Sequence, residues 1–72
     1  MSLNPQPVIH SNSPVLDETP VALVWSSEPS SIVFKSTYAE AIRYLKNSSI
    51  PDCYNIRRVI NGKLGRFVSY VL

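Results

Sequence analysis

Two short apolar runs separated by turn-forming residues open the patterned part of the chain. Residues 21–25 read Val-Ala-Leu-Val-Trp, and residues 32–34 read Ile-Val-Phe. The intervening residues 26–31, Ser-Ser-Glu-Pro-Ser-Ser, are rich in turn-forming types. Two β-rich runs joined by a short polar loop predict a β-hairpin, which needs a further element to pack against.

A helical period replaces this pattern after residue 36. Thr37 and Glu40 have the spacing of a capping box, in which the two residues satisfy each other's backbone N–H groups at a helix start. We predict an amphipathic helix that ends near Asn47, because asparagine adopts the left-handed conformation that ends helices. Its apolar face is formed by residues at i, i+3, i+4 and i+7, namely Tyr38, Ala41, Ile42 and Leu45.

A second helix is predicted over residues 49–61. Pro51 and Asp52 suit a first helical turn, because proline needs no N–H there and a carboxylate complements the positive helix end. Asn61 and Gly62 are typical of a helix stop. A connection of about three residues between two helices is typical of a helix-turn-helix. The predicted apolar face comprises Cys53, Ile56, Val59 and Ile60, and the opposite face carries Tyr54, Arg58 and Asn61, flanked by Asn55 and Arg57.

The two ends of the chain complete the predicted organisation. Residues 66–72 alternate between two sets of side chains and predict a closing C-terminal strand. Residues 1–20 contain four of the 6 prolines together with Asn and Ser, so we expect a flexible tail there. The predicted fold class is therefore α+β: a small domain over residues 21–72 in the order β-β-α-α-β, with a β-hairpin, a helix-turn-helix and a closing strand.

Composition narrows the class of protein. The 72 residues allow one small domain, and 44% hydrophobic with 17% charged residues is a globular composition. No apolar run approaches the roughly 18 residues of a membrane span. No basic segment precedes an apolar stretch as it does in a secretory signal. We therefore expect an intracellular protein, cytoplasmic or nucleoid-associated, that makes no membrane contact.

Few residues suit catalysis or metal binding. The single cysteine, Cys53, excludes an internal disulfide and a multi-thiolate zinc site, and we interpret it as a small buried hydrophobe. The single histidine, His10, lies in the predicted tail. Glu40 and Asp52 are explained by helix starts, and the other carboxylates show no paired spacing. We predict a non-enzymatic protein with no cofactor and no metal.

Charge is unevenly distributed along the chain. Residues 1–30 hold three acids and no Lys or Arg, whereas residues 31–72 hold seven Lys or Arg against two acids, a net charge of +5. Such a basic field attracts nucleic acid. Arginine and asparagine can hydrogen-bond base edges, and lysine contacts phosphates. We predict a nucleic-acid-binding module, for duplex DNA in preference to RNA. The predicted contacts are Tyr54, Asn55, Arg57, Arg58 and Asn61 on the second helix, with Lys46, Lys63 and Arg66 around it.

Two stretches resemble a known family. Residues 32–45, with Ser36, Glu40-Ala41 and Leu45, match a "strand, Ser, Glu-Ala-x-x-x-Leu" signature, and residues 55–63 and 69–71 complete it. The pattern is similar to the nuclease-associated modular DNA-binding domain of homing endonucleases, over residues 21–72. The resemblance implies a hairpin, a helix-turn-helix and a closing strand that grip DNA while a separate domain cuts it. It also implies DNA-facing Asn55, Arg57, Arg58 and Lys63, and a core containing Ala41, Leu45 and Ile56.

A protein-interaction module, or an inhibitor of a larger protein, is the alternative interpretation. Residues 14–16 or residues 21–25 could add a strand to a partner's sheet. The C-terminal strand, residues 66–72, could instead pair with a second copy, because a terminal strand exposes an unpaired edge. Aromatic residues dominate protein contact surfaces, which makes candidates of Trp25, Tyr44, Tyr54 and Tyr70.

Overall fold

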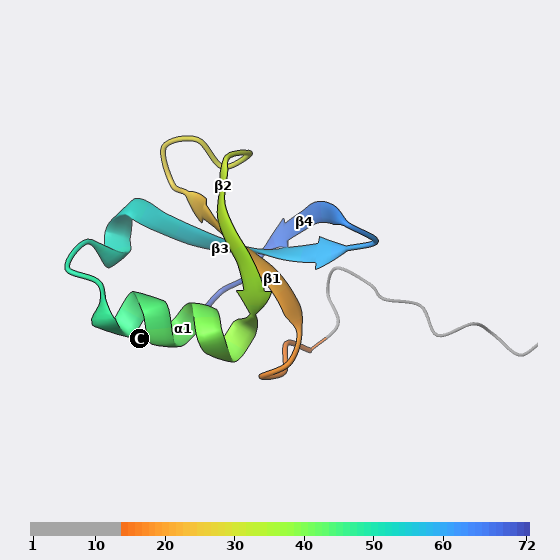
Figure 1. Cartoon of the computed structure of the whole chain (residues 1–72), viewed down its shortest axis with the longest axis horizontal. Coiled ribbons are helices and arrows are strands. Elements are labelled where there is room, and N and C mark those ends of the chain that lie inside the picture. Colours follow the sequence, from red (N-terminus) through yellow and green to blue (C-terminus); the bar gives the residue numbers. More distant parts are fainter. Residues whose placement is uncertain (1–13) are drawn as a thin grey trace, which may run out of the picture.

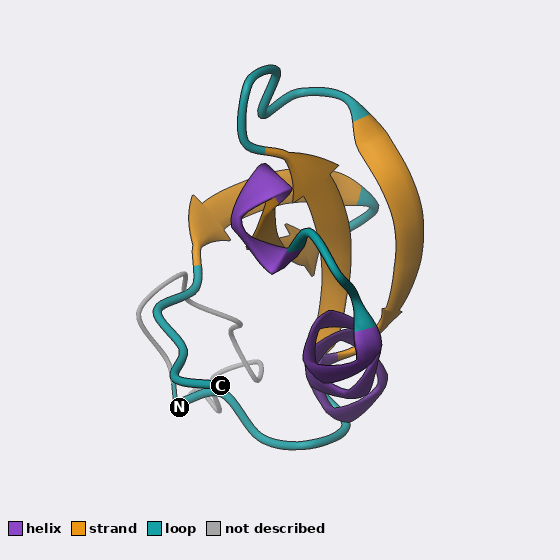
Figure 2. Ribbon diagram, turned by 90° about the vertical axis from the view of Figure 1, so that its left-hand side faces the viewer, coloured by secondary structure: helices purple, strands orange, loops and turns teal. Residues whose placement is uncertain are grey.

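A four-stranded antiparallel sheet with one helix against it forms the domain (Figures 1 and 2). The computed structural model describes residues 14–72. The strand order is β2-β1-β3-β4, so β1 and β3 are the inner strands. In chain order the elements are β1 (Pro20–Trp25), β2 (Ile32–Thr37), α1 (Tyr38–Asn47), the 3-10 turn η1 (Pro51–Cys53), β3 (Tyr54–Ile60) and β4 (Lys63–Phe67).

The predicted hairpin of residues 21–34 is confirmed as β1 and β2. Leu23 is the Cα partner of Phe34, and a register shift follows between Leu23 and Val24. All four side chains from Val21 to Val24 are fully buried. A strand buried on both faces needs a neighbour on each edge, and β3 supplies the second neighbour of β1.

The predicted first helix and its capping box are also confirmed. Thr37 Oγ1 accepts from the Glu40 N–H at 3.3 Å, and Glu40 Oε1 accepts from the Thr37 N–H at 3.2 Å. The next amides of the helix start find their acceptors in the preceding segment. The N–H groups of Tyr38 and Ala39 donate to the carbonyl oxygens of Thr19 at 2.9 Å and Asp17 at 3.0 Å. The N–H groups at the helix start are thereby satisfied by the capping box and by the segment that precedes β1.

The predicted second helix, and with it the helix-turn-helix fold class, is wrong. Residues 54–60 form the strand β3, and helical geometry is confined to the three residues of η1. Asn61 and Gly62 have φ angles of 53° and 79°. Two consecutive residues with positive φ form the primed turn that joins tightly paired antiparallel strands. The Asn-Gly pair therefore connects β3 to β4 instead of ending a helix.

The C-terminal residues also differ from the prediction. The last strand, β4, ends at Phe67, so residues 68–72 do not form the edge that was expected to pair with a second copy. Instead the Val68 N–H donates to the Ile56 carbonyl at 2.8 Å, and Val68 is buried. The Tyr70 hydroxyl donates to the Tyr54 carbonyl oxygen at 3.3 Å. This segment thus lies back against β3.

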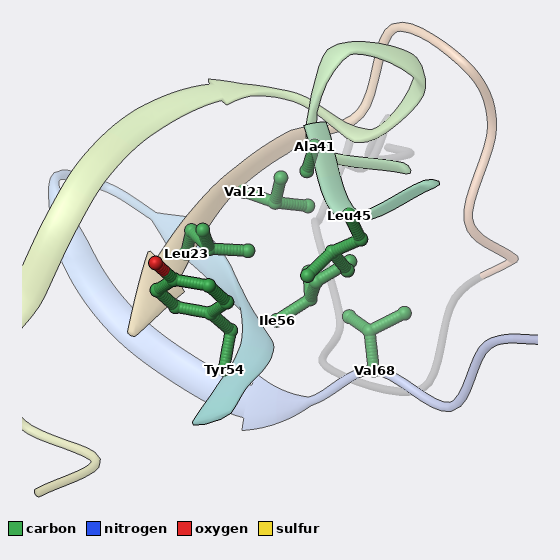
Figure 3. Close-up of a cluster of buried hydrophobic side chains, with 7 residues drawn as sticks. All are labelled: Val21, Leu23, Ala41, Leu45, Tyr54, Ile56 and Val68. Atoms are coloured by element: carbon green, nitrogen blue, oxygen red, sulfur yellow. The ribbon is translucent and has the colours of Figure 1, made fainter. Parts of the chain in front are cut away.

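The core lies between the sheet and α1 (Figure 3). Ala41, Leu45 and Ile56, which the sequence places in the core, are buried. Cys53, which was expected to be buried with them, is exposed. The predicted tail, residues 1–20, falls mostly outside the described residues, as does His10. The buried cluster consists of Val21, Leu23, Ala41, Leu45, Tyr54, Ile56 and Val68.

Candidate functional site

The predicted nucleic-acid contacts do not share one helix face. Tyr54 and Arg58 alternate with Asn55 and Arg57 along β3, so each pair belongs to a different face of the sheet. Tyr54 and Arg58 are buried on the side that packs against α1. The remaining predicted contacts are exposed on the turn, on β4 and on the last turn of α1: Asn61, Lys63, Arg66 and Lys46.

Arg57 lies across the face of the sheet that is opposite α1. Its Nε donates to the Gly65 carbonyl oxygen at 2.8 Å, and its Nη1 donates to the Pro29 carbonyl oxygen at 3.0 Å. The guanidinium carbon is 5.0 Å from the ring centroid of Phe67. Arg57 is also the Cα partner of Ala22 in β1. This side chain therefore ties the β1–β2 loop to β4.

Arg58 is buried on the other face of the sheet, the one that packs against α1, with 4% of its surface exposed. It is the Cα partner of Val21 in β1, and Gly65 of the edge strand β4 lies close to it. A Cβ added at Gly65 would meet the Arg58 Cβ at 3.5 Å and the Ile60 Cδ1 at 3.3 Å. The expected helix that displays two adjacent arginines to solvent is therefore absent.

Four aromatic rings instead form a continuous row, which we call the aromatic row: Trp25, Tyr54, Tyr44 and Phe34. Trp25 stacks on Tyr54, with centroids 5.0 Å apart and an interplanar angle of 28°. Tyr54 meets Tyr44 edge to face at 5.7 Å, and Tyr44 meets Phe34 edge to face at 5.0 Å. The rings come from β1, β3, α1 and β2, so all four elements position this surface.

Strand register explains why these rings meet. Trp25 and Tyr54 are Cα partners at the end of the β1–β3 ladder, and Phe34 is the partner of Leu23 in the neighbouring pair. Tyr44 reaches the same place because it follows the buried Ala41 by three residues, which puts the two side chains on neighbouring parts of the helix surface. The packing of the core therefore fixes the rings in position.

Two of the rings are solvent-exposed although Tyr54 between them is buried. Trp25 has 38% and Tyr44 has 42% of its surface exposed. Two further exposed apolar side chains lie at the same end of the sheet, Ile32 at the start of β2 and Ile50 just before η1. No pocket is found in the part of the chain that the structure describes. The surface is therefore suited to a shallow contact and not to enclosing a small molecule.

Acidic residues flank the Trp25 end of the aromatic row. The Glu28 N–H donates to the Trp25 carbonyl at 3.2 Å, which places Glu28 in the turn that follows β1. Ser26 joins this loop to η1, because its N–H donates to the Cys53 carbonyl at 2.8 Å and its hydroxyl donates to the Asp52 carbonyl at 3.3 Å. Residues 20–34 and 47–56 contain no Lys or Arg. Both carboxylates are exposed, so this end has negative local charge.

The hydroxyl of Tyr54 stays neutral at physiological pH. The interaction with the Tyr44 side chain, followed by burial, raises the pKa of Tyr54 above its ordinary value of 10.0. The indole N–H of Trp25 and the hydroxyl of Tyr44 belong to exposed side chains, so the aromatic row combines apolar ring surface with polar donors.

Other kinds of site are not found within residues 14–72. No group of three or more His, Cys, Asp or Glu residues there is placed to hold a metal ion. None of the helical segments in this range has the length and apolar character needed to cross a membrane. Within these residues the aromatic row is therefore the candidate functional surface.

Only part of this surface could be identified from the sequence. Trp25, Tyr44 and Tyr54 were candidate protein contacts, and the structure brings these three together; Tyr70 contacts the Tyr54 backbone instead of joining the row. Phe34 was missed, although its place in a strand next to a buried partner could have indicated its position. No known protein family, curated protein or solved structure matches this chain, and the resemblance to the homing-endonuclease module stays a prediction.

Proposed function

We propose that this domain is a non-enzymatic protein-interaction module and that the aromatic row is its contact surface. The observation that supports the proposal is the exposure of Trp25 and Tyr44 on either side of the buried Tyr54 ring. Full burial of an aromatic ring removes about 150–250 Å² of surface from water, and the 38% and 42% of the Trp25 and Tyr44 surfaces that remain exposed are available for a partner to cover. Such residues are enriched among those that dominate binding energy.

Preorganisation strengthens this argument. Trp25 is already stacked on Tyr54, and Tyr44 is held edge to face between Tyr54 and Phe34. Binding therefore does not have to immobilise these rings, and the entropy that ordering a side chain usually costs is reduced. A partner would meet a surface that already has its bound shape.

Nucleic-acid binding stays a prediction, but without the helix that was expected to enter a groove. Arg57 uses its guanidinium on the carbonyls of Gly65 and Pro29. Glu28 and Asp52, beside the Trp25 end of the row, would repel phosphates. The exposed cations of β4, Lys63 and Arg66, are the remaining groups suited to a phosphate backbone.

Selection from a random-peptide display library tests the proposal. We expect the domain to retain peptides that lose about tenfold or more in affinity when Trp25→Ala or Tyr44→Ala is tested. Phe67→Ala is the matched control, because it removes an exposed ring (54%) outside the row. Circular dichroism of each variant verifies that the fold is retained.

Two results would overturn the proposal. One is that no selected peptide depends on Trp25 or Tyr44. The other is that labelled single-stranded or duplex oligonucleotides bind at physiological salt and lose binding on Trp25→Ala, which would assign the row to nucleic acid. A loss of oligonucleotide binding that is confined to Lys63→Ala and Arg66→Ala would assign nucleic-acid contact to β4 and leave the row to proteins.

A further inference from the structure

We infer that the ligand of the aromatic row is an extended, proline-rich peptide segment that carries a lysine or arginine. This inference rests on the proposed function and names the chemistry of the partner. Three features of the described residues support it: partly occupied sheet edges, ring spacing that suits a polyproline II helix, and acidic residues at one end of the row.

Parts of both sheet edges are occupied, which makes them less suited to a partner that adds a strand. At the end of β2 the Thr37 N–H donates to Glu40 at 3.2 Å, and the Thr37 carbonyl accepts from the Ser36 hydroxyl at 2.9 Å. Lys35 is exposed on the same strand, and a charged side chain is a common protection of an edge. On the other edge the Gly65 carbonyl is bonded to Arg57. Side chains are therefore better placed than main-chain groups to recognise a partner.

The ring spacing fits a polyproline II helix. Such a helix has three residues per turn and advances about 3.1 Å per residue, or about 9 Å per turn. The centroids of Trp25 and Tyr44 lie 5.0 Å and 5.7 Å from that of Tyr54. The two exposed rings are therefore no farther apart than the sum of these distances, which is of the same order as one turn of the peptide. Prolines one turn apart could each pack on one exposed ring.

The hydrogen-bond donors of the aromatic row also match the acceptors of a polyproline II peptide. Polyproline II peptides have no internal hydrogen bonds, and proline lacks an N–H, so their carbonyl oxygens need external donors. The Trp25 indole N–H and the Tyr44 hydroxyl, both on exposed side chains, are donors. The peptide is already extended before binding, so little conformational entropy is lost. A shallow surface is sufficient for such a ligand, and no pocket is found within residues 14–72.

The charge at the Trp25 end specifies the flanking residue. Glu28 and Asp52 are exposed there, on two loops that Ser26 joins. A lysine or arginine next to the prolines would pair with these carboxylates and fix the direction in which the peptide binds. Charge complementarity of this kind contributes more to specificity than to affinity.

Fluorescence titration with synthetic peptides tests the inference, because Trp25 is the only tryptophan and lies in the site. The probe is a ten-residue peptide that repeats Pro-Pro-Leu and ends in arginine. We expect saturable binding that weakens about tenfold when the prolines are replaced by alanine. Replacing the terminal arginine by glutamate should weaken it about two- to fivefold. Glu28→Gln with Asp52→Asn should abolish that charge preference, whereas Glu18→Gln, a matched exposed acid, should preserve it.

The outcomes separate this inference from the proposed function. If display selection yields peptides that depend on Trp25 but lack proline, and the proline probe gives no saturable change, the ligand class is wrong and the interaction function stands. If no peptide of any composition depends on Trp25 or Tyr44, both fail. If the proline probe binds equally with a terminal arginine or glutamate, the assigned role of Glu28 and Asp52 is wrong.

Discussion

Arg57 donates from Nε to the carbonyl oxygen of Gly65 at 2.8 Å, so a charged side chain joins the inner strand β3 to the edge strand β4. A second bond to the Pro29 carbonyl, at 3.0 Å, reaches the β1–β2 loop. An arginine next to another arginine in a basic sequence suggests a ligand contact, but here the guanidinium completes the fold.

Replacing Arg57 by alanine should destabilise the domain. Hydrogen bonds that involve a charged group contribute about 1.5–3 kcal/mol, so we expect a loss of about 2–3 kcal/mol in unfolding free energy for Arg57→Ala. Arg57→Lys should restore little, because an ammonium cannot reproduce the planar fork. The exposed Arg66→Ala is the control, expected to change stability by less than about 0.5 kcal/mol. Urea unfolding followed by circular dichroism measures this; equal midpoints for Arg57→Ala and Arg66→Ala would contradict the assignment.

Gly62 should be sensitive to substitution for a purely backbone reason. A Cβ at this position would meet nothing within 4 Å, but the φ angle of +79° is unfavourable for an L-residue. Gly62→Ala should therefore cost about 1–2 kcal/mol of unfolding free energy. Asn61→Gly, at φ 53°, should be close to neutral because both residues tolerate the left-handed region. Thermal or urea unfolding would distinguish them, and an unaffected Gly62→Ala would refute the primed turn.

The capping box of α1 should contribute measurably. Thr37→Ala removes the hydroxyl that accepts from the Glu40 N–H at 3.3 Å, and loss of such a cap typically costs about 1 kcal/mol. Thr37→Ser preserves the acceptor and should retain most of the stability. Amide hydrogen exchange of the first turn of α1 provides a local measurement. Unchanged protection in Thr37→Ala would show that the Thr19 and Asp17 carbonyls suffice to hold the helix start.

Alkaline pH should weaken the fold through Tyr54. Because the folded-state pKa of Tyr54 is raised above 10.0, its contribution to stability is complete below pH 10 and is lost as the pH rises through the folded-state value. Tyr44→Phe removes the largest cause, so it should lower the pKa of Tyr54 toward 10.0. Ring-carbon NMR of tyrosine against pH measures this titration. Tyr38→Phe is the control and should leave the Tyr54 titration unchanged; an unshifted pKa in Tyr44→Phe would show that burial dominates.

Local chemistry was sufficient for the first half of the domain. The capping box of Thr37 and Glu40 depends on residues three apart, and the loop between β1 and β2 is built of turn-forming residues. Such interactions form within a few residues and do not depend on the rest of the fold. The apolar face with Ala41 and Leu45 follows from helical period alone, and both residues are buried as expected.

The secondary structure of residues 53–60 was ambiguous from the sequence, because both a helical period and the two-residue period of a strand fit them. Cys53, Ile56 and Ile60 match a helical stripe, whereas Tyr54, Ile56 and Arg58 match an alternating strand, and the structure has the latter buried. Arg58 is charged although it occupies one of the buried positions, so the alternation of apolar and polar residues could not be recognised from the sequence. The Asn-Gly pair at residues 61–62 is compatible with a helix stop, but it is also the commonest sequence of a tight hairpin turn. The local sequence therefore allowed both structures.

The aromatic row is likewise a product of tertiary structure. Its four rings are spread between residues 25 and 54, and no local pattern relates Trp25 to Tyr54. They meet because β1 and β3 pair in a register that makes these two residues Cα partners. The sequence could name aromatic residues as candidate contacts, but it could not show which of them share a surface.

The amino-acid sequence by itself determined the first hairpin and the capped helix, because each depends on neighbouring residues. The tertiary structure decided whether residues 54–60 became helix or strand. The continuous apolar run Val21–Val24 is buried on both faces and has two edges to satisfy, and β2 can pair with only one of them. The backbone hydrogen bonds on the remaining edge require a second strand, so β3 forms there.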